Sequence, residues 1–376
     1  MNRIYFDNAA TTPLDPEVME VMVRAYQELH GNPSSIHEEG RRARAAIEQA
    51  RKEIATLLNA SIGEIFFTSG GTEANNMALK CAVRDLGIQR IVSSRTEHHC
   101  VWHSLEALRR DQGTEVIFLR QSPNGHIDLG HLQSLLASGG PKTLVSLMHA
   151  NNEVGTLTDL QEVGSLCRNF GAYFHTDTVQ TLGYYPIDLH ALPIDFLAGS
   201  AHKFHGPKGV GFIYINQRNS LRPFVDGGSQ ERNMRGGTEN IAGILGMAAA
   251  LSKACGEMEG RRAKTMEVRN YLAQRLKEDI PDMEWNGDPF GQGHYKLLSV
   301  GFPPGPKTEL LLLNLDIAGI AVSGGSACSS GAEAGSHVMD ALKKDSPRKT
   351  IRFSFSHLNT VEEVDFLMDQ LKNIGI

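Results

Sequence analysis

The chain has 376 residues, a formal net charge of -6 at pH 7 and five cysteines. Its length suits two domains with room for a buried cofactor site, and its acidic balance argues against a nucleic-acid-binding protein. No apolar run reaches the roughly 20 residues of a membrane helix, and the N-terminus lacks a secretory signal. Because the cysteines form no CxxC pair, we expect a reduced, cytoplasmic enzyme without a metal site.

Short apolar runs alternate with amphipathic segments from about residue 16 to about residue 255. The runs that predict strands are 64–68, 90–93, 116–119, 143–148, 172–175, 195–197 and 210–215. Amphipathic segments such as 41–58 and 72–85 predict helices between them. This alternation predicts an α/β fold with a mostly parallel sheet flanked by helices, in which ligands bind beyond the carboxyl ends of the strands.

The pattern changes from about residue 256. Helices are predicted at 257–278, around 309–318 and at 360–374, and strands at 297–301 and 351–354. We therefore expect a large cofactor-binding domain at 16–255 and a smaller α/β domain formed by 1–15 and 256–376. Segment 323–331 consists only of Ser, Gly, Ala and one Cys, which predicts a mobile loop at about 323–337.

Segment 199–203 (GSAHK) ends an apolar run and is followed by GPKG at 206–209. A lysine there would lie at the rim of a buried strand, among residues that can satisfy a phosphate. Pyridoxal phosphate needs such a lysine, because its aldehyde condenses with an amine. Most lone lysines after a strand are solvated surface charges, so the interpretation of Lys203 depends on the other motifs.

Asp177 follows the apolar run 172–174 and would be largely desolvated. A buried carboxylate needs a cationic partner, and a protonated pyridine nitrogen would meet that need. Gln180, three residues later, could donate to the phenolic oxygen of the cofactor. A structural Asp that caps the next turn is the alternative.

Residues 67–75 read as a strand, a glycine turn and a helix start. Gly71 allows close approach of a ligand, and the N–H groups of a helix N-terminus favour an anion. The alternative is a tight strand-to-helix turn capped by Thr72. His98 could stack on the pyridine ring and move protons at neutral pH, whereas His99 is expected at the surface and no metal site is expected.

Segment 151–155 (NNEVG) offers a side-chain amide that could hold a phenolic oxygen or a carboxylate, although an ordinary Asn-rich turn would look the same. Arg352 lies inside an apolar strand, and its guanidinium matches an α-carboxylate. An internal ion pair remains an equal alternative.

Cys328 lies in the small, polar segment 323–331, which suits a thiol that must reach a buried site and then leave it. The other four cysteines fall in helix-like or strand-like settings. They are expected to be small buried hydrophobic residues, namely Cys81, Cys100, Cys167 and Cys255.

Several further motifs follow one another along the chain: DNAATTP at 7–13, GNPSS at 31–35, SAHKFHGPKG at 200–209, RGGTEN at 235–240 and GSAC at 325–328. With the features above, the sequence resembles, nearly end to end, the cysteine desulfurases of the class V aminotransferase group. The resemblance implies fold type I with a seven-stranded sheet, pyridoxal 5'-phosphate, and a homodimer with shared sites. The cysteine loop is similar to that of enzymes that feed iron–sulfur cluster assembly.

The resemblance also assigns cofactor roles to matching positions. Lys203 would be the Schiff-base lysine, Asp177 the partner of the ring nitrogen and His98 the stacking residue. Gln180 and Asn152 would reach the phenolic oxygen and its surroundings. The phosphate would be held by Thr72, Ser200, His202 and, from the other subunit, Thr238.

For the substrate, the resemblance implies that Arg352, helped by Asn152 and Asn32, binds the carboxylate of L-cysteine. The freed amine of Lys203 would remove the α-proton. The Cys328 thiolate would attack the substrate sulfur and carry it away as a persulfide, which leaves L-alanine. His98 would move protons between the two thiols.

Alternatives remain within and outside this class. A selenocysteine lyase or a class V aminotransferase would share most of the motifs, and a catalytically idle protein could serve as a sulfur-trafficking hub. Sulfur acceptors, such as an iron–sulfur scaffold, are expected partners. Two positions depart from the family pattern: Thr178 replaces the usual alanine under the ring, and Ala201 replaces a common glycine. Since the sequence ends at Ile376, before the extension with which some relatives dock scaffold proteins, a standard scaffold partnership is less expected.

Overall fold

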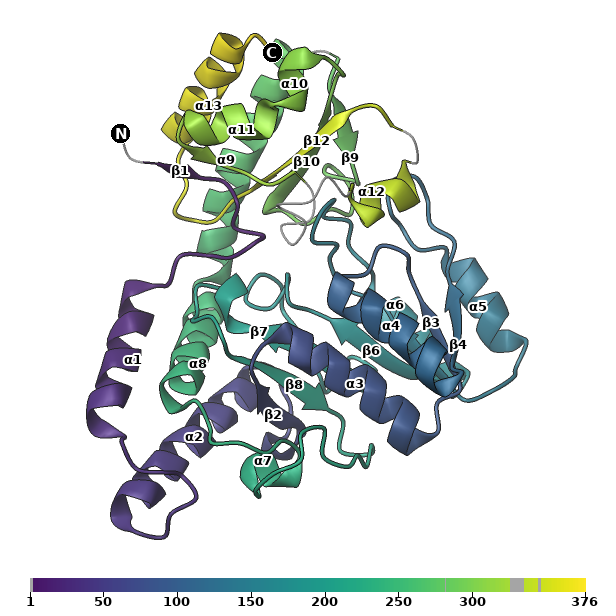
Figure 1. Ribbon diagram of the computed structural model, residues 1–376, viewed down its shortest axis with the longest axis vertical. Helices are drawn as coiled ribbons and strands as arrows, with labels where there is room; N and C mark the ends of the chain where they lie inside the picture. Colours follow the sequence, from purple (N-terminus) through teal and green to yellow (C-terminus); the bar gives the residue numbers. More distant parts are fainter. Residues whose placement is uncertain (1–2, 281, 325–334, 344–345) are drawn as a thin grey trace.

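The computed structural model describes residues 3–280, 282–324, 335–343 and 346–376. Figure 1 shows a larger lobe around a central sheet, with a smaller lobe above it that holds the C-terminal elements and strand β1 (Ile4–Tyr5). The predicted α/β class is confirmed.

A seven-stranded sheet forms the centre of the large lobe, as predicted. In chain order its strands are β2 (Ile65–Thr68), β3 (Arg90–Ser93), β4 (Glu115–Phe118), β5 (Thr143–Ser146), β6 (Tyr173–Asp177), β7 (Phe196–Ser200) and β8 (Gly211–Ile215). Across the sheet the order is β2-β8-β7-β6-β5-β3-β4. Strand β8 is antiparallel to both of its neighbours, and the other adjacent pairs are parallel. Every strand predicted in this part of the sequence therefore corresponds to a strand in the structure.

Helices pack on this sheet because its central strands are apolar on both faces; every residue of β2, β3, β5, β7 and β8 is buried. Helix α3 crosses in front of the sheet in Figure 1, and α8 packs against α1 and α2. The helices of the large lobe are α1 (Pro16–Glu28), α2 (Glu38–Leu57), α3 (Gly71–Leu86), α4 (His99–Gln112), α5 (Leu129–Ala137), α6 (Leu160–Asn169), α7 (Gln230–Asn233) and α8 (Ile241–Gly256), with short 3-10 turns η1 (Ile62–Glu64) and η2 (Ala201–Lys203).

The small lobe has a hydrophobic cluster of its own, to which residues such as Phe6, Leu272 and Phe353 contribute. Its strands are β9 (Glu284–Asn286), β10 (Leu297–Phe302) and β12 (Lys349–Ser354), which form an antiparallel sheet, and β11 (Ile320–Ala321), which pairs with β1. Its helices are α9 (Met258–Asp279), α10 (Pro306–Glu309), α11 (Leu311–Ile317), α12 (His337–Leu342) and α13 (Val361–Ile374). The helix predicted around 309–318 is thus divided at Leu310. The division of the chain at residues 15 and 255 stays a prediction.

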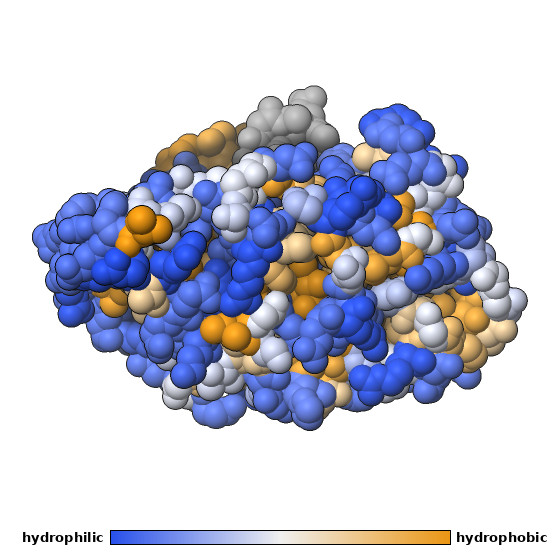
Figure 2. Space-filling model, turned by 90° about the horizontal axis from the view of Figure 1, so that it is seen from below, coloured by the Kyte–Doolittle hydropathy of each residue, from blue (hydrophilic) through white to orange (hydrophobic). Residues whose placement is uncertain are grey.

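Within the described ranges, no single helix is long and apolar enough to cross a membrane; only α8 and α9 taken together pass that test, and they are bent by 75° at their junction. Figure 2 shows that the lower face of the molecule is mostly hydrophilic, with hydrophobic residues exposed among the polar ones.

The N-terminal segment links the two lobes and forms part of the wall of a cavity. Phe6 N donates to Ala321 O in the small lobe, and Thr12 N donates to His202 O in the large lobe. Residues 7–11 therefore cross from one lobe to the other beside the carboxyl end of β7.

Candidate active site

A cavity of about 250 Å³ lies where the carboxyl ends of β6 and β7 meet the first turn of α3. Ala9, Ala10 and Arg352 line it from the N-terminal segment and the small lobe. Most of the predicted site residues line this one cavity: Gly71, Thr72, His98, Asn152, Asp177, Gln180, Ser200, His202, Lys203 and Arg352. The fold thus brings together chemistry that is scattered over the sequence.

Two of the predicted residues that the structure describes do not line this cavity. Asn32 is exposed in the connection between α1 and α2, and its Oδ1 atom accepts from Ser34 N at 2.9 Å. Thr238 is also exposed, and it lines a separate hollow. Cys328 lies outside the described residues.

Lys203 ends η2, directly after strand β7. Its Nζ atom donates to Ala9 O at 2.6 Å and to Ala10 O at 2.8 Å. The backbone carbonyl of Lys203 accepts from the hydroxyl of Tyr184 at 2.9 Å. The lysine is therefore oriented at both its backbone and its amine, with the amine at the wall of the cavity.

Asp177 is the last residue of β6 and is 6% exposed. Its Oδ1 atom accepts from Val179 N at 2.9 Å and its Oδ2 atom from Asn75 Nδ2 at 2.6 Å. Burial raises the pKa of Asp177, whereas these two donors and the charge of Lys203 act in the opposite direction. A buried carboxylate at a cavity wall is suited to a cationic ligand group.

His98 is the N-cap of α4, and its Nδ1 atom accepts from Cys100 N at 3.2 Å. Because Nδ1 is an acceptor, the proton of the neutral ring lies on Nε2. Burial, with a contribution from the charge of Lys203, lowers the pKa of His98 to about 4. The ring is consequently neutral at pH 7.

Cys100 is a finding that sequence reasoning missed. It was predicted to be a buried hydrophobic residue, but it lines the cavity, and its Sγ atom is 3.0 Å from His98 Nδ1. Cys81 and Cys167 are buried as predicted, and Cys255 is half-buried. The position of Cys100 two residues after a histidine, at a helix start that follows a strand, is the signal that could have indicated this contact.

Arg352 forms the internal ion pair that was one of its two predicted alternatives, and its binding of a carboxylate stays a prediction. Its guanidinium donates to Asp7 Oδ1 at 2.9 Å and to Asn152 O at 2.7 Å, so an internal ion pair is present. Its Nε atom is buried and has no hydrogen-bond partner within the described residues. These two bonds use two of the five N–H groups of the guanidinium, so the side chain keeps further donors at the cavity that it lines.

The two neighbouring asparagines of segment 151–155 have different roles. Asn151 forms the turn that was the structural alternative, because its Oδ1 atom accepts from Glu153 N and Val154 N at 2.9 Å. Asn152 lines the cavity instead, and its Oδ1 atom is buried without a partner in the described part of the chain.

Gln180 lines the cavity, and its expected bond to the phenolic oxygen stays a prediction. Its Nε2 atom donates to Ala9 O at 3.0 Å, and its Oε1 atom is buried without a partner among the described residues. Buried polar atoms without partners at a cavity wall indicate a polar ligand. Thr178, expected under the ring, does not line the cavity; its hydroxyl donates to Ala198 O at 2.9 Å, and Val179 lines the cavity instead.

Gly71 begins α3, and an added Cβ there would lie 2.6 Å from Val179 Cγ2. We expect Gly71→Ala to destabilise the protein by about 1–3 kcal/mol through overpacking and to weaken cofactor binding. Equilibrium unfolding and cofactor titration measure both effects. Gly260→Ala in α9 is the control, because its Cβ would meet nothing within 4 Å; an equal loss in the two variants would contradict the prediction.

Buried histidines predict how stability depends on pH. Burial lowers the pKa of His98, His149 and His202 to about 4 and that of His175 and His205 to about 3. In the unfolded chain these rings titrate near about 6.5, so between about pH 6.5 and pH 4 the unfolded state binds more protons. The free energy of unfolding of the apoprotein should therefore fall as the pH drops through this window.

Buried carboxyls oppose this trend. Burial raises the pKa of Glu97 to about 8 and also raises the pKa of Glu153, Asp177 and Glu239, and a raised carboxyl pKa costs stability as the pH rises above about 4.5. The five histidines outnumber these four carboxyls. Urea unfolding at neutral and at mildly acidic pH measures the net slope. His205→Asn should show a shallower slope, and equal stability of the wild type at both pH values would contradict the prediction.

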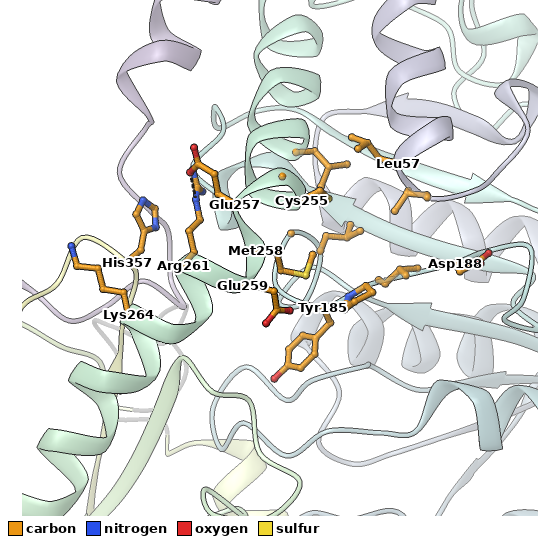
Figure 3. Close-up of a pocket in the computed structure, with 18 residues that line it drawn as sticks. Leu57, Tyr185, Asp188, Cys255, Glu257, Met258, Glu259, Arg261, Lys264 and His357 are labelled. Carbon is orange, nitrogen blue, oxygen red and sulfur yellow. Dashed lines mark hydrogen bonds and ion pairs between the residues drawn. The ribbon is translucent and has the colours of Figure 1, made fainter.

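A larger cavity of about 760 Å³ lies elsewhere, where α2 and the junction of α8 and α9 meet segment 182–188. Figure 3 shows Arg261, Lys264 and His357 on one side of it and Leu57 and Asp188 on the other. None of the predicted catalytic or cofactor-binding residues lines this cavity. The smaller cavity is therefore the candidate active site, despite its size.

The residues of the smaller cavity suit pyridoxal phosphate. The residues that line this space carry an amine, a buried carboxylate and two amide oxygens without a partner among the described residues, and the first turn of α3, with its N–H groups, borders it beside Ser200 and His202. Within the described ranges, no group of three or more metal-ligating side chains could hold a metal ion. The fold and the cavity together define a pyridoxal phosphate enzyme of fold type I.

The chain belongs to the aminotransferase class V family, whose model matches residues 4–367. It is 41% identical to a cysteine desulfurase IscS of Dictyoglomus turgidum, over 99% of this chain and 94% of that protein, and 40% identical to a cysteine desulfurase IscS of Methanosarcina thermophila, over 99% and 91%.

Solved structures show the same likeness. A NifS-like protein superposes with a TM-score of 0.91 at 35% identity and covers 99% of both chains. A structure described as SspA in complex with cysteine superposes with a TM-score of 0.79 at 30% identity, over 95% of this chain and 100% of that one. The predicted family, enzyme class and cofactor are confirmed.

Proposed function

We propose that this chain is a cysteine desulfurase that converts L-cysteine to L-alanine and receives the sulfur on Cys328. The observation that carries the proposal is the meeting of Lys203, Asp177 and Arg352 at one small cavity. Relatives at about 40% identity are named cysteine desulfurases, and one similar structure holds cysteine. The guanidinium of Arg352, which lines this cavity, suits the carboxylate of a small amino acid.

When bound, pyridoxal phosphate supplies an aldehyde that reacts with amines and a ring that accepts an electron pair. The residues of the chain do the rest. Lys203 provides the amine that anchors the cofactor and afterwards accepts the α-proton of the substrate. Asp177 holds the positive charge of the ring nitrogen, and Arg352 with Asn152 fixes the carboxylate. His98 is neutral, with its proton on Nε2, and would move protons between the substrate and acceptor thiols.

Sulfur transfer breaks the bond between the substrate Cβ and its sulfur and forms a bond between that sulfur and Cys328 Sγ. The thiolate supplies the attacking electron pair, and the carbon product receives protons to become L-alanine. Two described serines lie on either side of Cys328 in the sequence. Ser323 Oγ donates to Asp7 Oδ1 at 2.8 Å, and Ser336 Oγ donates to Glu153 Oε2. Asp7 is the ion-pair partner of Arg352, and Glu153 follows Asn152, which lines the cavity.

Peptide-mapped mass spectrometry after brief exposure of the purified holoprotein to L-cysteine tests this function. One extra sulfur on the peptide that contains Cys328, absent from the untreated sample, is the expected result. A holoprotein that reacts with amino acids but gains no sulfur would point instead to an aminotransferase or a selenocysteine lyase. Binding of sulfur acceptors by a Lys203→Ala variant without turnover in the wild type would indicate a sulfur-trafficking hub.

We further propose a homodimer in which each site borrows residues from the other subunit. Thr238 and Asn32 are exposed and outside the cavity of their own chain, which supports a role in the partner's site. Helix α1 also exposes an apolar stripe formed by Met19, Val23 and Tyr26, and such a stripe is typical of a covered interface. We also propose that a sulfur-acceptor protein binds to this enzyme transiently and that the enzyme is located in the cytoplasm.

Mixing two impaired variants tests the shared site. If Lys203 of one subunit works with Thr238 of the other, a mixed dimer of Lys203→Ala and Thr238→Ala chains contains one site with both native residues. We expect the refolded mixture to form alanine faster than the sum of the two parent preparations. Activity equal to that sum, with mixed dimers shown by native mass spectrometry, would contradict the shared site.

A further inference from the structure

The Asp177 carboxylate is held by a hydrogen-bonded chain that reaches well behind the cavity. Asn75 Nδ2 donates to Asp177 Oδ2 at 2.6 Å, Asn75 Oδ1 lies 3.0 Å from His175 Nε2, and His175 Nδ1 lies 2.9 Å from Ser146 Oγ. Asn75, His175 and Ser146 are each 0% exposed. Burial of polar groups is costly unless they are hydrogen-bonded, so a fully buried row of them that ends on one carboxylate indicates a role for that carboxylate in addition to packing.

The fold explains how this row forms. His175 and Asp177 are two residues apart on β6, so their side chains point to the same face of the sheet. Ser146 on β5 is paired with His175 in the strand register. Asn75 comes from the second turn of α3, which packs on this face and begins at Gly71 beside the cavity.

Hydrogen-bond chemistry fixes the direction of the row. An ionised carboxylate can only accept, so the amide nitrogen of Asn75 faces Asp177; the same nitrogen also donates to Cys100 Sγ at 3.3 Å. The oxygen of Asn75 must then accept from His175 Nε2–H. His175 Nδ1 is left without a proton and accepts from the Ser146 hydroxyl. Every donor therefore points toward Asp177, and burial, which lowers the pKa of His175 to about 3, keeps that ring neutral.

We propose that Asn75, supported by His175 and Ser146, is a positioning residue that keeps Asp177 ionised and oriented toward the ring nitrogen of the bound cofactor. Donors aligned along one row strengthen one another and stabilise the negative charge at its end. This role concerns the protonation of the cofactor ring and does not depend on which thiol accepts sulfur.

The test is the ¹⁵N chemical shift of the ring nitrogen in holoprotein reconstituted with labelled pyridoxal phosphate, recorded across a pH series. The wild type should keep a protonated ring nitrogen throughout. Asn75→Ala should move the protonation equilibrium of that nitrogen by on the order of tenfold toward the neutral form, since it removes a hydrogen bond to a charged group. Ser146→Ala should move it in the same direction by less.

Asn76→Ala is the matched control, because Asn76 lies on the same helix but donates to Thr72 O and accepts from Ser104 Oγ. Its ring nitrogen should behave as in the wild type. An unchanged ring nitrogen in Asn75→Ala would overturn the proposal. If Asn75→Ala does not bind the cofactor, Ser146→Ala decides: a wild-type signal there overturns the supporting role of the row, and a shifted one upholds it. The readout requires no sulfur chemistry, so it is separate from a failure of the proposed desulfurase activity.

Discussion

Replacement of Lys203 by alanine is expected to reduce alanine formation from L-cysteine by at least about 10³-fold, because the variant loses both the amine that anchors the cofactor and the proton acceptor. The amine lies at the cavity wall, held by Ala9 O and Ala10 O, and its charge affects both Asp177 and His98. Alanine assay together with the visible absorption of the protein measures the effect.

The control for this experiment is Lys208→Ala, which removes an exposed lysine five residues later in the same glycine-rich segment. It should keep both colour and turnover. Substantial turnover in Lys203→Ala would remove the anchoring role from Lys203 and transfer it to another amine. Loss of folding is monitored by circular dichroism, so that an unfolded variant is not counted as an inactive one.

Replacement of Cys328 by alanine is expected to abolish persulfide formation while the protein stays yellow. Ser323 and Ser336, on either side of Cys328 in the sequence, hydrogen-bond to Asp7 and Glu153. Neither Asp7 nor Glu153 is among the residues predicted to hold the cofactor. The substrate sulfur would then have no thiolate acceptor on the loop, and net alanine formation should fall to background. Mass spectrometry of persulfide and the absorption spectrum report the two effects separately.

Cys100→Ala is the informative companion variant, because Cys100 is a thiol that lines the cavity itself. Burial raises the pKa of Cys100 to about 12, so at neutral pH it is a thiol and a poor nucleophile. This variant should still place sulfur on Cys328. Persulfide on Cys100 in the Cys328→Ala protein would contradict the assignment and make Cys100 the acceptor.

Much of the architecture follows from local patterns in the chain. The strands of the large lobe follow from apolar runs bounded by turns, and the cofactor-binding candidates follow from polar residues placed just after those runs. Because the carboxyl ends of parallel strands meet at one edge of the sheet, the sequence predicts that Asp177 and Lys203 lie close together. The sequence alone also indicates the family, because its motifs occur in the family's order from residue 7 to residue 328.

Contacts between distant segments required the folded chain. The amide orientation of Gln180 depends on Ala9, the exposure of Cys100 to the cavity depends on the start of α4, and the partner of Asp177 is Asn75, 102 residues away. Periodicity specifies which face of an element is buried, but it does not specify which atom of another element lies opposite that face. Packing between the lobes also determines that Arg352 donates to Asn152 O and Asp7 Oδ1, while its Nε atom has no partner among the described residues.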